Sequence, residues 1–292
     1  MVNYTTEKKN IYQINSEVIK KVTESGIRII KHRENKEALY NPICILGMPG
    51  IADIGKFALD SLIGQLNAEN YMDIIFNDYP AGAIVDNSLL SAPKAEIFFW
   101  KDPEKLRDIV LITADAQSLT PKGIYKISDF LAEIIKDFGI KLIIALGAHP
   151  VSSRKLDSRN PKIFATSTNK ILLDEYLEKY DAFMIEKGVI IGANGLIPTL
   201  AKARFNIDGL VFLAETDNIA MVNEDITDLR ASIALLEMLK NSFTLPIKKE
   251  YSMDNIDDIT KNLQIKKDQI ERDLDTFQID DNTEDKRKSL YI

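Results

Sequence analysis

The stretch Pro42-Ile43-Cys44-Ile45-Leu46-Gly47-Met48-Pro49-Gly50 decides the fold class of this chain. Its first five residues form a continuous apolar run, and the last four are rich in glycine and proline, which is typical of a buried strand that ends in a tight turn. Behind the turn, residues Asp53–Leu66 place apolar side chains at helical spacing, with Asp53 as a candidate N-cap. The sequence therefore predicts a strand, a glycine-rich turn and a helix in succession.

The same alternation continues along the chain. Further strands are predicted at Asp73–Asn77, Ala95–Trp100, Ile109–Thr113, Leu142–Leu146 and Leu210–Leu213, and further helices at Lys122–Phe138, Asn194–Arg204 and Ile226–Leu245. Strands that alternate with helices favour a mostly parallel sheet flanked by helices. We therefore expect an α/β fold, with residues 1–248 as one core domain.

Composition narrows the classes of function. The 292 residues carry a formal net charge of -7, whereas proteins that bind nucleic acid need clustered Lys and Arg. The single cysteine, Cys44, excludes a disulfide within the chain, and with His32 and His149 far apart a His/Cys metal site is not expected. No segment reaches the roughly 18 apolar residues of a membrane span. We expect a cytoplasmic protein that binds neither nucleic acid nor membranes and uses no cofactor or metal.

Residues 249–292 differ in composition from the core, because charged residues dominate and glycine and proline are absent. Four apolar residues nevertheless recur at sevenfold spacing, and Ile259 falls at the matching d position, whereas the later d positions are Lys266 and Asp273. The recurring residues are Ile256, Leu263, Ile270 and Phe277. Since this seam is interrupted, it fits a helical oligomerisation stalk and, equally, a solvated helix or a disordered extension.

Residues Gly50–Phe57 match the phosphate-loop pattern G-x-x-x-x-G-K, follow the first predicted strand and open a helix. The match fails at its last position, because a phosphate loop needs a Ser or Thr hydroxyl on Mg²⁺ and Phe57 has none. The simpler interpretation is a tight turn between strand and helix, with Phe57 in the core. An anion at this helix N-terminus remains physically reasonable.

Other glycine-rich stretches mark a candidate ligand crevice. The first is Gly147–Val151, which contains His149 and follows an apolar strand, where α/β folds place ligand-binding loops. No serine elbow, cysteine nucleophile or obvious carboxylate pair accompanies the histidine, so a plain loop histidine is the simpler alternative. A second stretch leads into a helix through Gly192 and Gly195, and its glycines suit chain packing as well as a ligand. A further segment, Glu215–Asp217 after the predicted strand Leu210–Leu213, contains no glycine and is predicted as a turn whose role is equally open. Together with Gly47, Gly50 and Gly55, the residues His149, Gly192 and Gly195 make up the candidate crevice.

The chain ends in Leu290-Tyr291-Ile292, behind a polar, charged stretch. Terminal residues are usually mobile and solvated, so a role in the core is the least expected explanation for this apolar end.

Several of these stretches, taken in order, resemble the proteasome assembly chaperone family. The resemblance spans about Pro42 to Leu245, and its specificity comes from the order and spacing of glycine turns beside apolar runs. The stretches are Gly47-Met-Pro-Gly50-Ile with Gly55, the strand and loop Leu142–Pro150, Gly192-Ala-Asn-Gly195-Leu196-Ile197, and the strand Leu210–Leu213 followed by Glu215-Thr216. The resemblance implies an α/β fold whose topology is related to that of nucleoside phosphorylases.

The resemblance also implies a function. Archaeal members of the family are homo-oligomers that bind the proteasome core particle, and several end in a hydrophobic-Tyr-any motif, which Leu290-Tyr291-Ile292 matches. A flexible tail with an apolar and aromatic anchor and a terminal carboxylate suits insertion into a pocket with a basic residue at its floor. The resemblance places that pocket between adjacent α subunits of the 20S proteasome. We therefore expect a non-enzymatic assembly chaperone or activator. The alternative is a phosphorylase-like or ATP-grasp-like enzyme that acts on a phosphorylated or nucleotide ligand, which rests on fold analogy alone.

Overall fold

The computed structural model describes residues 26–33, 38–86, 88–152, 160–180, 182–217, 228–243 and 245–247. The chain divides into two units, Met1–Lys248 and Lys249–Ile292, and all the described residues lie in the first. The predicted seam from Ile256 to Phe277 and the tail Leu290–Ile292 lie outside the described residues.

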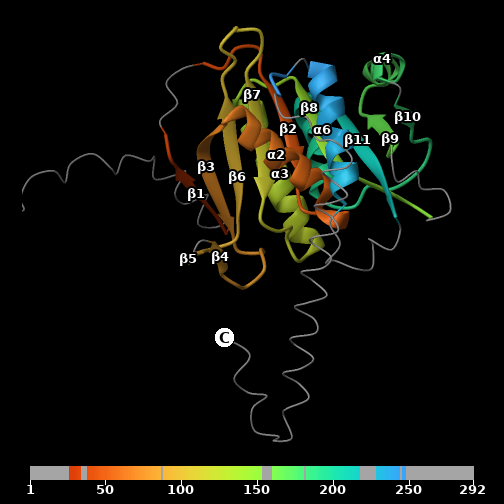
Figure 1. Cartoon of the computed structure of the whole chain (residues 1–292). Helices are drawn as coiled ribbons and strands as arrows, with labels where there is room; N and C mark the ends of the chain where they lie inside the picture. Colours follow the sequence, from red (N-terminus) through yellow and green to blue (C-terminus); the bar gives the residue numbers. More distant parts are fainter. Residues whose placement is uncertain are drawn as a thin grey trace, which may run out of the picture. The chain divides into compact units, whose positions relative to one another are not determined.

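A nine-stranded sheet is the centre of the described part of the chain (Figure 1). Its strands in chain order are β1 (Ile27–Lys31), β2 (Ile43–Gly47), β3 (Glu69–Phe76), β6 (Lys94–Trp100), β7 (Ile109–Ala114), β8 (Leu142–Val151), β9 (Ile163–Ser167), β10 (Phe183–Met184) and β11 (Asp208–Asp217). In space they follow the order β1-β3-β6-β7-β2-β8-β11-β9-β10. A separate hairpin of β4 (Ile84–Asp86) and β5 (Leu89–Ser91) connects β3 to β6.

The four central strands β7, β2, β8 and β11 run parallel to one another. All residues of β2 and β7 are buried, which explains why their sequences are nearly continuous apolar runs, with Thr113 as the polar exception, instead of alternating patterns. On one side of this centre β1, β3 and β6 pair antiparallel, and on the other side β9 pairs antiparallel with β11 and parallel with β10. The predicted α/β fold with its sheet flanked by helices is confirmed, and the antiparallel strands at both sides are an addition to it.

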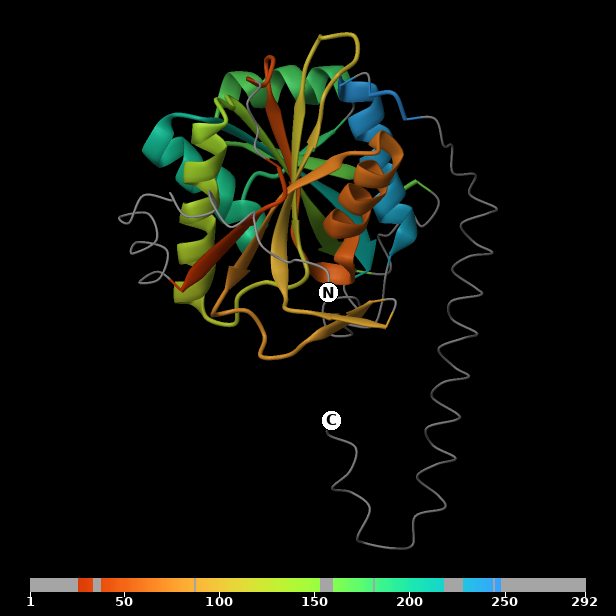
Figure 2. The same cartoon turned by 90° about the vertical axis from the view of Figure 1, so that its left-hand side faces the viewer.

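Helices cover both faces of the sheet (Figure 2). The short 3-10 helix η1 (Ile51–Asp53), α2 (Ile54–Leu66) and α6 (Leu229–Phe243) lie on one face, and α3 (Pro121–Asp137) and α5 (Ala193–Phe205) lie on the other. The remaining helix of the described chain is α4 (Lys170–Tyr180), which packs beside β9. Alternate residues of each central strand face the two layers, so that Cys44 and Leu46 join the core beneath α3 and α5 while Ile45 is buried on the opposite face.

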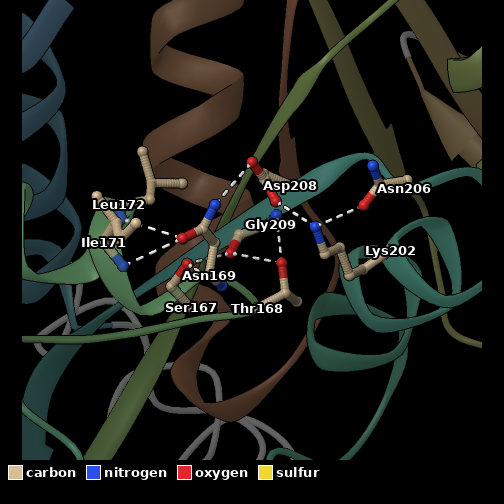
Figure 3. A network of polar contacts seen from close by, with 9 residues as sticks. All are labelled: Ser167, Thr168, Asn169, Ile171, Leu172, Lys202, Asn206, Asp208 and Gly209. Carbon is tan, nitrogen blue, oxygen red and sulfur yellow. Dashed lines mark hydrogen bonds and ion pairs between the residues drawn. The ribbon is translucent and has the colours of Figure 1, made fainter.

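A polar network fixes the amino end of β11 (Figure 3). Asn169 caps α4, since its Oδ1 accepts hydrogen bonds from the backbone N–H groups of Ile171 (3.1 Å) and Leu172 (3.4 Å). Its Nδ2 donates to Asp208 Oδ2 at 3.1 Å, and Lys202 Nζ donates to Asp208 Oδ1 at 2.8 Å. Asp208 therefore joins the start of β11 to the start of α4 and the end of α5.

Two predictions made from local composition are wrong. Gly147–Val151 is not a loop but the second half of β8, and Glu215–Asp217 is not a turn but the end of β11. The reason is long-range pairing, because β8 and β11 match residue by residue from Leu142 opposite Asp208 to Val151 opposite Asp217.

Candidate functional site

The candidate site lies around the β2 loop, which we define as residues Gly47–Asp53. This loop follows β2 at the carboxyl ends of the parallel strands, where β7 flanks β2 on one side and β8 on the other. In open α/β sheets such a switch point is the usual place for ligands. The position therefore agrees with the place where the sequence predicts a crevice.

Side chains from other elements hold the backbone of the β2 loop. Asn194, at the start of α5, accepts a hydrogen bond from Met48 N (2.9 Å) and donates to Met48 O (3.1 Å), and this amide is buried. Gln117 donates from Nε2 to Pro49 O (2.6 Å), while its Oε1 accepts from Ala193 N (3.0 Å). These bonds tie the loop to the start of α5 and to the chain that follows β7, so the backbone groups of Met48 and the carbonyl of Pro49 are occupied by the protein itself.

Gly47 and Gly55 serve chain packing. A Cβ at Gly47 would lie 2.3 Å from the backbone oxygen of Gly55, and a Cβ at Gly55 would lie 2.3 Å from the backbone oxygen of Leu146. Glycine at both positions allows the first turn of α2 to approach β2 and β8 backbone to backbone. The backbones of the helix and the strands thus occupy the space that a ligand between them would need.

The other predicted glycines differ in their surroundings. A Cβ at Gly195 would lie 2.8 Å from Ile190, so this glycine too permits close packing. A Cβ at Gly50 would have its nearest neighbour, Met48 O, at 3.9 Å, which is an ordinary contact. Gly192 has φ +93°, a conformation that favours glycine, and it lies against Gln117.

The phosphate-loop-like segment Gly50–Phe57 has an unusual backbone. Ala52 and Asp53 have positive φ values of 51° and 47°, which non-glycine residues adopt rarely. Asp53 precedes α2 as predicted but does not cap it, because its carboxylate accepts a hydrogen bond from Gly50 N at 3.3 Å instead. Phe57 is 39% exposed, so its predicted place in the core is wrong. Lys56 pairs with Asp60 at 2.9 Å on the same helix and does not reach toward the loop.

A small pocket lies behind the β2 loop, with an interior volume of about 10 Å³. This is room for about one water molecule. Its lining residues are Met48, Tyr79, Ala116, Gln117, Ser118, Ile124, Ile127, Leu131 and Ala193. Burial raises the pKa of the Tyr79 phenol above its ordinary value, with a further contribution from the Asp115 carboxylate. The Ser118 hydroxyl is buried and has no hydrogen-bond partner among the described residues.

His149 lies on β8, two residues beyond Gly147. Its ring stacks on Phe164 of β9 at a centroid distance of 4.1 Å, and Glu215 of β11 is its partner in the strand register. Burial lowers the pKa of His149 below its ordinary value, against the opposing effect of the Glu215 carboxylate, and so favours the neutral ring. Glu215 is 2% exposed and accepts a hydrogen bond from Lys162 N at 3.3 Å.

The sequence-based reasoning missed this neighbour of His149. Both residues follow apolar runs of parallel strands, and the carboxyl ends of parallel strands meet at one edge, so the pair could have been found from topology. The predicted crevice residues therefore fall into two groups, with the glycines around the β2 loop and His149 beside Glu215.

Among the described residues there is no group of three or more His, Cys, Asp or Glu side chains that could hold a metal ion. No described helix has the length and apolar character to cross a membrane.

Known proteins share this architecture. PbaB of Pyrococcus furiosus, described as an archaeal proteasome activator, superposes with a TM-score of 0.70 and 25% identity, over 85% of this chain and 99% of PbaB. PbaA of the same organism, described as an archaeal homolog of proteasome-assembly chaperone, has a TM-score of 0.65 and 18% identity, over 87% of this chain and 97% of PbaA. An uncharacterized protein of Methanocaldococcus jannaschii is 26% identical over 192 residues, which are 65% of this chain and 72% of that protein.

The family assignment rests on a separate match. The model of the PAC2 family matches residues 44–269, which begin in β2 and extend past the end of α6. The matched region contains the β2 loop, the paired strands β8 and β11, and the start of α5 with Asn194. This chain is a member of the PAC2 family.

Proposed function

We propose that this protein is a proteasome assembly chaperone or activator that binds the α ring of the core particle. The observation that carries the proposal is the likeness of this PAC2-family chain to PbaB, described as an archaeal proteasome activator, which extends over 99% of that chain at 25% identity. PbaA, described as a homolog of proteasome-assembly chaperone, shares the fold.

The geometry around the β2 loop supports a binding protein over an enzyme. The loop carbonyls of Met48 and Pro49 are engaged by Asn194 and Gln117, and the described pocket behind the loop has room for about one water molecule. An active site needs catalytic groups that converge on open space where a substrate can lie. Here the polar groups converge on the backbone of the protein itself.

The proposed contact with the α ring is the tail Leu290-Tyr291-Ile292. Tyr291 supplies a large amphipathic ring, Leu290 adds apolar burial of about 1.5–3 kcal/mol if it is fully enclosed, and the carboxylate of Ile292 can form a charge-assisted hydrogen bond. Ordering a free tail offsets much of this energy, so a single tail binds weakly. Useful affinity then arises when an oligomer presents several tails to a ring with several pockets. We propose the seam from Ile256 to Phe277 as the oligomerisation element.

Two variants test separate parts of the tail contact. Tyr291→Ala removes the ring, and one extra residue after Ile292 displaces the carboxylate while every side chain stays. Both should abolish most binding to immobilised proteasome α rings and leave the unfolding temperature unchanged. The matched control is Tyr125→Ala, because Tyr125 is 58% exposed on α3. Native binding by both tail variants would refute the tail as the anchor, and an effect of Tyr125→Ala would show that α3 belongs to the interface.

A further inference from the structure

Ser118 brings a buried hydroxyl to the pocket behind the β2 loop. The residue follows β7, is 6% exposed and lines the pocket. Its Oγ atom has no hydrogen-bond partner among the described residues, and its backbone N–H and C=O take part in none of the backbone hydrogen bonds between them. Buried polar groups in folded proteins are normally paired with protein or with ordered water, because an unsatisfied one lowers stability. The Ser118 hydroxyl therefore points to a ligand inside the pocket.

The size and lining of the pocket define that ligand. An interior volume of about 10 Å³ suits a single water molecule and is too small for an organic molecule or a phosphate. Tyr79 lines the same pocket, is 7% exposed and brings a second hydroxyl. Burial and the Asp115 carboxylate raise the pKa of the Tyr79 phenol above its ordinary value, so the group keeps its proton and can donate. In the described structure no direct hydrogen bond joins the Ser118 hydroxyl to Tyr79.

We propose that one ordered water molecule is bound in this pocket and bridges the hydroxyls of Ser118 and Tyr79. A water that donates to one hydroxyl and accepts from the other satisfies both groups. Buried waters need two to four polar partners, and the two hydroxyls supply this minimum. Apolar side chains of α3 complete the lining and leave no room for a second water; they are Ile124, Ile127 and Leu131.

In this position the water supports the β2 loop from behind. Gln117, the neighbour of Ser118 in the chain, donates to Pro49 O at 2.6 Å and accepts from Ala193 N at 3.0 Å. Met48 and Ala193 line the pocket themselves. A water that fixes Ser118 therefore also fixes the Gln117 amide that joins the loop to the start of α5. This site is independent of the tail and of the proposed function.

Ser118→Ala in the full-length chain distinguishes a hydrated pocket from a dry one by the sign of its effect. If the water is bound, the substitution removes one of its two partners and should lower the urea midpoint of unfolding, whereas in a dry pocket it deletes an unsatisfied hydroxyl and raises the midpoint. The matched control is Ser128→Ala on α3. Ser128 is fully buried and its Oγ also has no partner among the described residues, but it does not line the pocket. This control should therefore keep or raise the midpoint.

Tyr79→Phe tests the bridge, because it removes the phenol oxygen and keeps the ring. It should lower the midpoint, and the loss in the double variant with Ser118→Ala should be smaller than the sum of the two single losses, since both hydroxyls bind the same water. A crystal structure of the native chain should show a water roughly 2.5–3.0 Å from Ser118 Oγ. The proposal is overturned if Ser118→Ala raises the midpoint, if the two losses add, or if the electron density of the native pocket contains no water.

Discussion

An alanine at Gly55 should destabilise the protein strongly, although it adds a single methyl group. The new Cβ would lie 2.3 Å from the oxygen and 2.6 Å from the carbon of the Leu146 backbone. Ordinary contacts of a Cβ begin at 3.4 Å. Since the obstacle is the backbone of the central strand β8 and not a flexible side chain, α2 has to move away from the sheet by about 1 Å.

The energetic cost follows from what α2 buries. Ile54, Ala58, Leu59 and Leu62 are almost completely buried by the contact of this helix with the sheet and with α6. Overpacking of a well-packed core typically costs 1–3 kcal/mol, and we expect about 3 kcal/mol because neither backbone can yield. For a chain of this size such a loss lowers the unfolding temperature by roughly 6–12 °C.

Gly64→Ala is the matched control on the same helix. A Cβ at Gly64 meets nothing within 4 Å, so the substitution should stabilise the protein by about 0.5–1 kcal/mol through helix propensity. Urea unfolding followed by circular dichroism measures both changes. If Gly55→Ala were as stable as the native chain, the close approach of α2 to β8 would be wrong, and Gly55 would again be free to border a ligand crevice.

Three further predictions concern the β2 loop and the network in Figure 3. Asn194→Leu leaves the backbone groups of Met48 without their partners and should cost about 2–4 kcal/mol in urea unfolding, whereas Thr199→Val on the exposed side of α5 should cost little. Hydrogen bonds from Lys202 and Asn169 hold the pKa of Asp208 below its ordinary value. The stability that Asp208 adds over Asp208→Asn, about 1 kcal/mol, should therefore be present above about pH 4 and disappear as the pH falls through the folded pKa. Calorimetric titration with ATP and Mg²⁺ should give no binding heat at micromolar affinity, because the phosphate-loop-like segment lacks the hydroxyl that holds the metal.

The parallel centre of the fold could be predicted from the sequence because burial on both faces leaves a plain signal. β2 and β7 are nearly continuous apolar runs, and each is followed by glycine or by a helical pattern. The helix predicted at Lys122–Phe138 is α3, which begins one residue earlier; in the structure the Thr120 hydroxyl caps it by accepting a hydrogen bond from Gly123 N at 3.0 Å, and Pro121 occupies its first position.

The elements at the edge of the sheet leave a weaker pattern in the sequence. β10 consists of two residues, and α4 buries only Leu173, so neither produces a periodic pattern that stands out from a loop. The second half of β8 was predicted as a loop because it contains glycine and proline. Pairing with β11 overrides that local composition, and Pro150 is tolerated because the pairing of β2 with β8 ends at Ala145, which leaves that edge of β8 free.

The candidate site likewise combines features that the sequence predicts with features that depend on tertiary contacts. The strand, turn and helix around the β2 loop could be predicted from the sequence, but the packing role of Gly47 and Gly55 depends on where β8 passes, which no local pattern contains. Asn194 and Gln117 bond to the loop from 146 and 68 residues away, and such contacts can be seen only once the chain is folded. The tail Leu290–Ile292 and the seam from Ile256 to Phe277 stay predictions.

The affinity of the purified full-length chain for proteasome α rings, compared with that of a chain that ends at Ser289, tests the proposed function most directly. We expect the full-length chain to bind and the shortened chain to lose at least about tenfold in affinity, equivalent to about 1.4 kcal/mol, with the same unfolding temperature for both. A full-length chain that does not bind the rings would contradict the proteasome role, and equal affinity of the two chains would contradict docking through Leu290-Tyr291-Ile292.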